Sequence, residues 1–417
     1  MTPAGRADIE AIWRDEAARV TATVARWVGG DLVLAEDLAQ DAVVAALEQW
    51  PRDGVPPNPG AWLTATARHR AIDLMRRHRT YQDKLAVLAR ELDTSEPPIE
   101  IDDATIDDDV LALVFACCHP VLAPEARVAL TLRLVGGLTT TEIARAFLVP
   151  GPTVGQRISR AKRTLAQAGV AFAVPAGDEL EQRLESVLEV VYLVFNEGYA
   201  ATTGEEWMRT DLQGEALRLG RLLAGVAPDQ PEVHGLLALM ALQASRQAAR
   251  VGPDGEPVLL DDQDRSRWDR GLIDEGLAAL DRAAALGRPA GPYRLQAEIA
   301  ACHARARSAA ETDWVAIAAR YEALVQIADT PVVELNRAVA LGRALGPEVG
   351  LAAVDALADE PTLAGYHLLP AVRGDLLARL GRAAEARAEF ARAAQLAGNA
   401  RERALLLARA RTAAASD

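Results

Sequence analysis

The sequence predicts an all-helical protein built from several domains. Half of its 417 residues are hydrophobic, yet only 4% are aromatic. Alanine, leucine and arginine dominate the composition, and these residues lose little rotamer freedom in a helix. The β-branched and aromatic residues that favour strands are comparatively sparse. A chain of this length has room for two or three cores.

Two helices are expected in residues 8–50, with a break at Gly29 and Gly30. Apolar residues recur at helical spacing in the first helix, namely Ile9, Ile12, Trp13, Ala17 and Val20. The second helix, about residues 34–50, places one apolar face inward, with Leu38, Ala42, Ala45 and Ala46. Residues 51–60 are rich in proline and glycine and are expected to form a loop.

A third helix is predicted from about Ala61 to Arg79, and it has two distinct faces. Its inner face carries Leu63, Ala67, Ala71 and Leu74. Its outer face is basic, with Arg68, His69, Arg70, Asp73, Arg76 and Arg77. Such a face can contact phosphates and base edges, although it could also be an ordinary solvated surface. Trp62, at the helix start, could stack on an unpaired base or anchor the core.

The charge distribution points to nucleic acid more strongly than the total does. The net charge is −14, which alone argues against DNA binding. Residues 62–80, however, carry a net +4 and residues 111–170 a net +5, whereas residues 81–110 between them carry −8. Two basic patches can neutralise phosphates locally. The acidic segment, with no apolar period from Leu92 to Asp109, is expected to be a flexible, extended linker.

Residues 138–165 predict a helix-turn-helix. Thr139 and Glu142 have the spacing of a capping box, and Pro150-Gly151 supplies the turn. The second helix has a buried stripe, Val154, Ile158, Ala161 and Leu165. Its opposite face suits a recognition helix in the major groove, with Thr153, Gln156, Arg157, Ser159, Arg160, Lys162 and Arg163.

From Asp178 onward, helices of 12 to 20 residues are expected to alternate with short turns. The offsets from Gly381 to Ala386, Phe390 and Ala393 match the tetratricopeptide pattern. Looser matches to the same pattern occur around Gly276 and at Ala338, Leu341 and Gly346. We therefore expect a tetratricopeptide-like domain whose units stack to bury their apolar faces.

Several polar features after residue 110 are candidates for a chemical role. Cys117-Cys118-His119 and Cys302-His303 lack the spacing of a zinc site, and buried structural cysteines are expected, with no metal. The triplet Asp211, Glu215 and Arg218 favours ion pairing within a helix. A polar group inside an apolar helix needs partners, which suggests a regulatory groove at Asn196, Glu197 and Tyr199.

Three ordered motifs resemble those of extracytoplasmic-function sigma factors. Residues 35–50 (AEDLAQDAVVAALEQW) are similar to the helix that docks on RNA polymerase, and residues 59–79 to the segment that opens and reads the minus-ten element. Residues 138–165 resemble the reader of the minus-thirty-five element. The long C-terminal part is similar to a subgroup with a tetratricopeptide-like extension, through VYLVFNEGYA and DLQGEALRLGRLL.

The resemblance implies four parts: sigma region 2 at 8–80, an acidic linker at 81–109, sigma region 4 at 110–172 and a regulatory domain at 178–417. It implies that Asp37, Leu38, Gln40 and Asp41 contact polymerase. It places Trp62, the basic face of 68–77 and the outer face of 153–163 at promoter DNA. His69 stands where many relatives carry Asn, which leaves the minus-ten preference open.

The expected partners are core RNA polymerase, promoter DNA and a protein or small molecule at the C-terminal domain. No cofactor and no catalysis are expected, since no P-loop, H-E-x-x-H or G-x-S-x-G pattern occurs. The lack of a signal peptide or apolar span indicates the cytoplasm. Two alternatives are a helix-turn-helix regulator with a sensory repeat domain that never replaces the resident sigma factor, and a scaffold with incidental basic patches.

Overall fold

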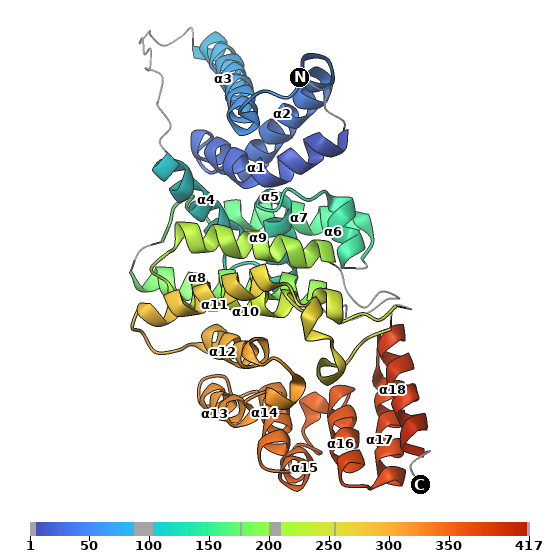
Figure 1. The fold of residues 1–417 in the computed structure, drawn as a ribbon. Coiled ribbons are helices and arrows are strands. Elements are labelled where there is room, and N and C mark those ends of the chain that lie inside the picture. Colours follow the sequence, from blue (N-terminus) through green and yellow to red (C-terminus); the bar gives the residue numbers. More distant parts are fainter. Residues whose placement is uncertain are drawn as a thin grey trace. The chain divides into compact units, whose positions relative to one another are not determined.

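The computed structural model describes residues 6–86, 103–147, 149–175, 177–199, 210–253 and 256–414. All regular elements in these ranges are helices, joined by turns and one isolated bridge between Val251 and Pro257. This confirms the all-helical prediction. The chain divides into two compact units, Met1–Val191 and Tyr192–Asp417, each described by itself below (Figure 1). Across the described ranges, no helix is both long and apolar enough to span a bilayer.

The described residues of the first unit form seven complete helices and most of an eighth. Their bounds are α1 (Arg6–Trp27), α2 (Leu32–Asp53), α3 (Pro59–Ala86), α4 (Asp103–Cys117), α5 (Pro124–Leu134), α6 (Thr140–Ala146), α7 (Gly151–Gln167) and α8 (Asp178–Tyr199). α1 packs against α2, α3 and α4, and α5 packs against α7. The buried stripe of α1 includes Ile9, Trp13, Ala17 and Val20, as the helical spacing predicted.

The break predicted at Gly29 and Gly30 is present, since these residues adopt φ of 68° and 85° and end the first helix. The helix predicted after it is α2. The side chain of Asp31 then caps α2 by accepting from the backbone N–H groups of Val33 and Leu34. The predicted loop 51–60 is shorter than expected. α2 runs through Pro51 to Asp53, where Gly54 ends it, and Asn58 caps α3 through the N–H of Ala61.

The predicted extended linker also needs correction at both ends. α3 continues to Ala86 and α4 begins at Asp103, so the first and last residues of the acidic segment are helical. Asp109 is buried, and its carboxylate accepts a 2.7 Å hydrogen bond from Arg26 Nε. Residues 87–102 lie outside the described residues.

The sequence places the start of the C-terminal domain at residue 178, but the division between the compact units falls later, within α8. The first part of α8 therefore belongs to the first unit, where polar contacts hold it against the end of α4. Arg183 donates to the carbonyl oxygen of Phe115 at 3.1 Å, and Ser186 donates to that of Cys118 at 2.6 Å. These bonds satisfy carbonyl groups at the end of α4, which a helix terminus leaves without partners.

The second unit is a stack of helices in which neighbours along the chain are neighbours in space (Figure 1). Its helices are α9 (Thr210–Val226), α10 (Pro231–Ala244), α11 (Arg270–Ala285), α12 (Pro292–Arg305), α13 (Trp314–Val325), α14 (Pro331–Ala344), α15 (Pro347–Asp355), α16 (Leu368–Arg379), α17 (Ala383–Leu396) and α18 (Ala400–Ala414). Such stacking lets each pair bury its apolar face against the next.

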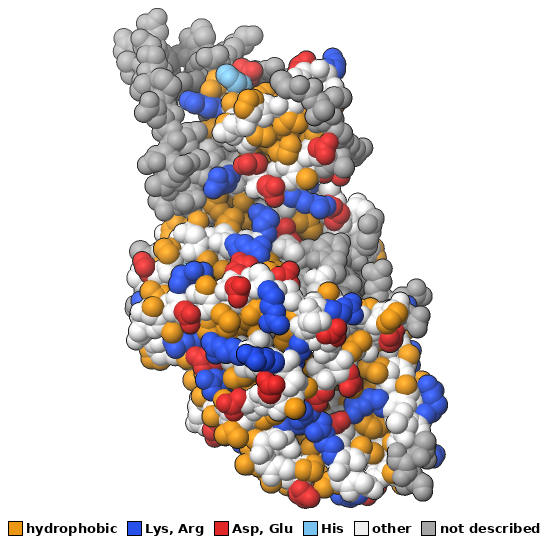
Figure 2. Space-filling view, viewed as in Figure 1, with side chains coloured by type: hydrophobic (Ala, Val, Ile, Leu, Met, Phe, Trp, Pro, Cys, Tyr) orange, Lys and Arg blue, Asp and Glu red, His pale blue; other side chains and the backbone are white. Residues whose placement is uncertain are grey.

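The motif around Gly381 forms the helical hairpin that its spacing predicted. Gly381 has φ of 72° in the turn between α16 and α17. Ala386, Phe390 and Ala393 are buried in the core that these two helices share with α18. On the face drawn in Figure 2, basic and acidic side chains are interspersed over the helices of this unit.

Candidate nucleic-acid interface

Three of the four residues predicted to contact polymerase lie on the accessible side of α2. Asp37 and Asp41 are exposed and Gln40 is half-buried. Asp41 forms an ion pair with Arg70 of α3 at 3.0 Å. Leu38 is only 3% exposed and belongs to the core. Its assignment as a surface contact is therefore wrong, since its side chain completes the apolar face of α2.

A groove of 560 Å³ lies between α1 and α3, where the basic face of α3 was predicted. Arg68 and His69 line it from α3, and Arg19 and Trp27 line it from α1. The Arg68 guanidinium lies 5.6 Å from the centre of the Trp27 ring, a cation–π distance. The groove thus combines an aromatic surface with positive charge, as single-stranded nucleic acid requires.

Trp27 was missing from the sequence prediction, because it stands in another helix and 41 residues separate it from its partner Arg68. Trp62 is half-buried and meets Trp50 edge-on at 5.3 Å between ring centres, which favours the anchoring interpretation. Asp73 is exposed. The side chains of Arg76 and Arg77 lie outside the described residues.

The helix-turn-helix has the local geometry that the sequence predicted. The backbone N–H of Glu142 donates to Thr139 Oγ1 at 3.2 Å, and the backbone N–H of Thr139 donates to the Glu142 carboxylate at 2.8 Å. These reciprocal bonds form the capping box and start α6. Burial raises the pKa of Glu142, but hydrogen bonds from Thr139 and the nearby Arg14 outweigh it and hold that pKa below its ordinary value.

α7 is amphipathic, with Val154, Ile158, Ala161 and Leu165 buried as predicted. Six of the seven residues predicted on its outer face are accessible. Thr153 and Arg157 are half-buried, and the exposed side chains are Gln156, Ser159, Arg160 and Arg163. A row of polar and cationic side chains on an otherwise packed helix can read base edges and neutralise phosphates.

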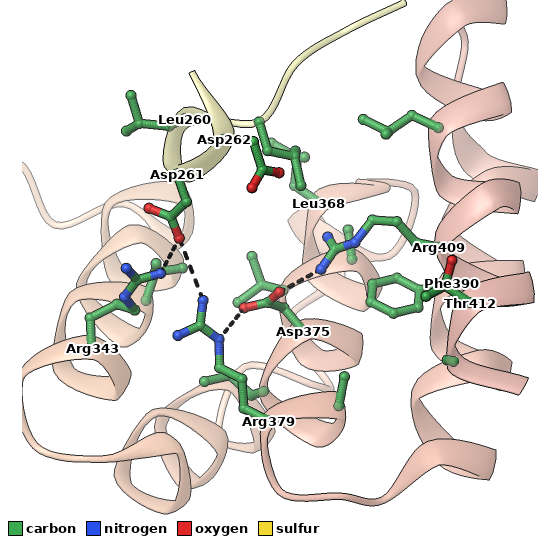
Figure 3. Close-up of a pocket in the computed structure, with 18 of the residues that line it drawn as sticks. Leu260, Asp261, Asp262, Arg343, Leu368, Asp375, Arg379, Phe390, Arg409 and Thr412 are labelled. Carbon is green, nitrogen blue, oxygen red and sulfur yellow. Dashed lines mark hydrogen bonds and ion pairs between the residues drawn. The ribbon is translucent and has the colours of Figure 1, made fainter. Parts of the chain in front are cut away.

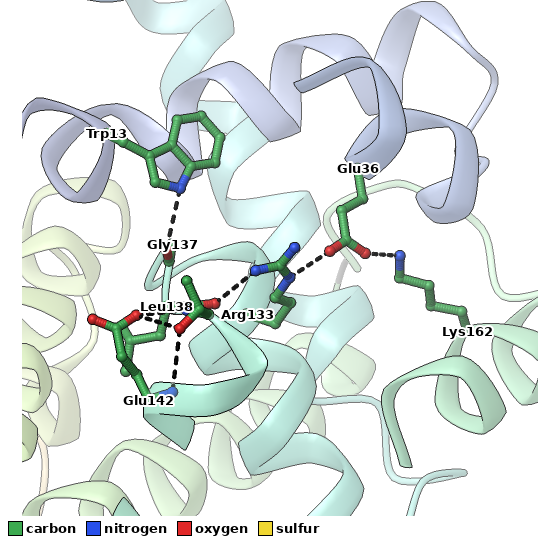
Figure 4. A network of polar contacts seen from close by, with 8 residues as sticks. Trp13, Glu36, Arg133, Gly137, Leu138, Glu142 and Lys162 are labelled. Carbon is green, nitrogen blue, oxygen red and sulfur yellow. Dashed lines mark hydrogen bonds and ion pairs between the residues drawn. The ribbon is translucent and has the colours of Figure 1, made fainter. Parts of the chain in front are cut away.

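Lys162 is the exception on α7 and corrects the sequence prediction. It is 7% exposed, and its ammonium group pairs with the carboxylate of Glu36 on α2. Arg133 at the end of α5 pairs with the same carboxylate (Figure 4). Lys162 therefore serves a contact within the protein in this structure and is not available to DNA.

Glu36, Arg133 and Lys162 form one network that joins the segments predicted to bind polymerase and DNA. Burial alone raises the pKa of Glu36, but the Lys162 ammonium and the Arg133 guanidinium outweigh it, so the pKa lies below its ordinary value. Nearby, Trp13 of α1 donates a hydrogen bond to the carbonyl oxygen of Gly137 at 3.1 Å (Figure 4). Arg14 of α1 also pairs with the capping residue Glu142.

The residues predicted for a regulatory groove occupy the end of α8 in the second unit. Tyr199 accepts from Arg246 through its hydroxyl and from Arg250 through its backbone carbonyl. The Arg250 guanidinium stacks 3.5 Å from the centre of the Tyr199 ring. Asn196 is half-buried and its side chain bonds to Tyr192. The side chain of Glu197 lies outside the described residues.

A larger cavity of 850 Å³ opens in the same unit, between residues 257–262 and the helices α14, α16 and α18. Arginine and aspartate side chains alternate across it (Figure 3). Asp261 pairs with Arg343 and Arg379, and Asp375 pairs with Arg379 and Arg409. Because these charges are paired with one another, they form a pre-organised rim and leave little free charge for a ligand.

The ion pairing expected in α9 is confirmed for Glu215 and Arg218, whose side chains bond at 2.7 Å. The expected burial of the cysteines is confirmed for Cys117 and Cys118, whereas Cys302 is partly accessible. Cys117 and Cys118 are at most 1% exposed. Burial, as the largest cause, raises the pKa of Cys118 to about 12 although a hydrogen bond with Thr131 opposes it. Such thiols stay protonated and packed as small apolar groups.

Comparison with protein families agrees with this geometry. Residues 14–81 match the model of Sigma-70 region 2, and residues 113–165 match that of Sigma-70 region 4. Residues 183–284 match DUF6596, described as a family of unknown function. An uncharacterized protein of Rhizobium meliloti (strain 1021) is 46% identical over 379 residues, which cover 90% of this chain and 89% of that protein.

The two matched regions are those of promoter-recognition proteins, a family that is not enzymatic. The chain belongs to the sigma-70 family, as a sigma factor of the extracytoplasmic-function type with a C-terminal extension. Regions 2 and 4 imply that it binds core RNA polymerase and promoter DNA.

Proposed function

We propose that this sigma factor directs core RNA polymerase to promoters with two elements and helps to melt them. Asp37, Gln40 and Asp41 on α2 contact polymerase. The groove between α1 and α3 holds the opened minus-ten element through Trp27 and Arg68. The observation that carries the proposal is α7, which presents a polar and cationic row opposite a fully packed stripe.

Strand capture in the groove follows from its composition. A flipped or unpaired base can stack on an aromatic ring, and a neighbouring guanidinium attracts its phosphate. In the helix-turn-helix, the first residues of α7, Thr153, Gln156 and Arg157, reach base edges in the major groove. Arg160 and Arg163 lie further along α7, where they contact phosphates and fix the register of the protein on DNA.

The Glu36 network joins region 2 to region 4, and we propose that it opens when the protein is active. Lys162 and Arg133 are then freed from Glu36, so region 4 gains cationic charge at the same time as α2 becomes accessible. The C-terminal helical domain, which we regard as tetratricopeptide-like, modulates this activity. A role at polymerase places the site of action in the cytoplasm.

Run-off transcription with purified core polymerase and genomic promoter fragments tests the proposal. Discrete transcripts that require this protein are expected, including one from its own upstream region. DNA binding that persists without any association with polymerase would instead favour a helix-turn-helix regulator that never replaces the resident sigma factor.

A further inference from the structure

The second unit contains a group of buried nitrogen atoms without hydrogen-bond acceptors among the described residues. They are Nε of Arg246, Nε of Arg265, the indole Nε1 of Trp268 and Nδ1 of His303. One buried acceptor, Oε1 of Gln263, is also without a partner. Buried polar groups almost always have partners in native proteins. Two of these residues, Arg246 and His303, line the same cavity, so one ligand there could bond to both nitrogen atoms.

Direct contacts connect four of these residues. The guanidinium groups of Arg246 and Arg265 lie 5.9 and 4.9 Å from the centre of the Trp268 ring. Arg265 donates to the carbonyl oxygen of His303 at 2.6 Å. Two cations therefore share one indole ring, and one of them borders the histidine. Like charges held this closely favour an anion nearby.

A cavity of 180 Å³ opens at this cluster, and Arg246 and His303 line it. Its other polar walls are Gln243, Gln296 and Tyr321. The apolar side chains Leu242, Leu260, Ile299 and Ala300 complete the lining. No acidic side chain occurs among the described residues that line it. The cavity is small, and α10, α12 and α13 supply most of its walls.

The electrostatics of His303 agree with this picture. Burial is the largest cause that lowers its pKa to about 4, and the charges of Arg246 and Arg265 lower it further. Asp261 opposes them, but its carboxylate is already paired with Arg343. The imidazole is thus neutral at physiological pH, and it lies in a positive potential.

We propose that the cavity lined by Arg246 and His303 is a binding site for a small oxyanion, either a carboxylate or a phosphate. Arg246 supplies the charge and a donor at Nε, and neutral His303 donates or accepts according to its tautomer. Neutral donors from Gln243 and Tyr321 fit further oxygen atoms. The site would give the C-terminal domain a small-molecule ligand, and it does not depend on the promoter-binding role.

Thermal unfolding of the full chain tests the proposal, with inorganic phosphate, sodium acetate and sodium chloride compared at equal ionic strength. Phosphate, acetate or both should raise the midpoint of the C-terminal unit more than chloride does, and the rise should grow with the logarithm of concentration. The more effective anion identifies the ligand group. Equal shifts with all three salts would overturn the proposal.

Arg246→Gln keeps a polar side chain but removes the charge, and it should weaken the anion response at least tenfold in concentration. Arg267→Gln is the matched control, since Arg267 is exposed and lies on the neighbouring segment. An Arg246→Gln protein with the wild-type response would contradict the site. If that variant does not fold, the ring resonances of His303 in the wild-type chain decide. They should shift saturably with the effective anion, and an unchanged spectrum would exclude binding. Neither readout involves transcription, so failure here is distinct from failure of the sigma-factor role.

Discussion

The indole nitrogen of Trp13 donates a hydrogen bond to the carbonyl oxygen of Gly137, 124 residues further along the chain. Gly137 has φ of 70°, and a Cβ atom there would lie 2.7 Å from the Cβ of Ala17. The residue is therefore constrained twice, by its backbone conformation and by the close approach of α1. This contact fixes region 4 against region 2 in the structure.

Gly137→Ala is expected to lower the free energy of unfolding of the first unit more than Gly169→Ala does. Both glycines have positive φ, and each substitution costs about 1–2 kcal/mol for that reason. Only at position 137 does the new methyl group meet another side chain, which adds about 1–3 kcal/mol of overpacking. Urea unfolding followed by tryptophan fluorescence compares the two variants. Equal losses would show that the contact with α1 relaxes without cost.

Glu36→Gln should loosen the tie between α2 and α7. The substitution leaves Lys162 and Arg133 largely buried without a carboxylate, a change that costs about 3–5 kcal/mol when a buried pair is broken. Lys162 should then react faster with an amine-specific reagent, as followed by mass spectrometry. Glu48→Gln is the control on the same helix, because Glu48 is exposed. Unchanged labelling of Lys162 in Glu36→Gln would contradict the role of the network.

The same network predicts a loss of stability in acid. The pKa of Glu36 is lower in the folded protein than its ordinary value of 4.5. Its contribution is therefore complete above pH 4.5 and is lost as the pH falls through the lower folded value. Thermal midpoints measured from pH 7 to pH 3 should decline more steeply for the wild type than for Glu36→Gln. Parallel curves would mean that other carboxylates dominate acid unfolding.

Arg160→Ala should weaken promoter binding about equally for all sequences, reduce the salt dependence of that binding by about one phosphate contact, and leave association with core polymerase intact. Arg160 is exposed on the outer face of α7, away from the buried stripe. Gln167→Ala, at the exposed end of the same helix, serves as control. Binding to a promoter fragment at several salt concentrations gives the test. An Arg160→Ala variant with wild-type affinity and salt dependence would remove this face from the interface.

The three cysteines should differ in reactivity towards a thiol reagent under native conditions. Cys302 is partly accessible, whereas Cys117 and Cys118 are buried, with pKa values raised mainly by burial. Cys302 should be labelled first, and the pair only when the first unit unfolds. Mass spectrometry of the labelled peptides gives the order. Early labelling of Cys118 would contradict its packing against Thr131.

The sequence was most informative where the decisive contacts are local. Thr139 and Glu142 of the capping box stand only three positions apart, and the stripe of α7 follows from one helical period, so both were predictable. The end of α2 was not, because Pro51 marks a boundary in general but is tolerated in this last turn. The burial of Lys162 was also unpredictable, since its partner Glu36 stands 126 residues away. Trp27 was missed for the same reason, as only the packing of α1 on α3 brings it to Arg68.

The shared carboxylate of Glu36 also limits which substitutions can be tolerated at three positions of the chain. One side chain balances two cations that come from separate helices of region 4. A substitution at any one of the three positions leaves a charge uncompensated, so each is constrained by the other two. Among relatives of this protein, positions 36, 133 and 162 should therefore change together or not at all. A lineage that lost the acid while keeping both bases would have had to stabilise region 4 against region 2 by other means.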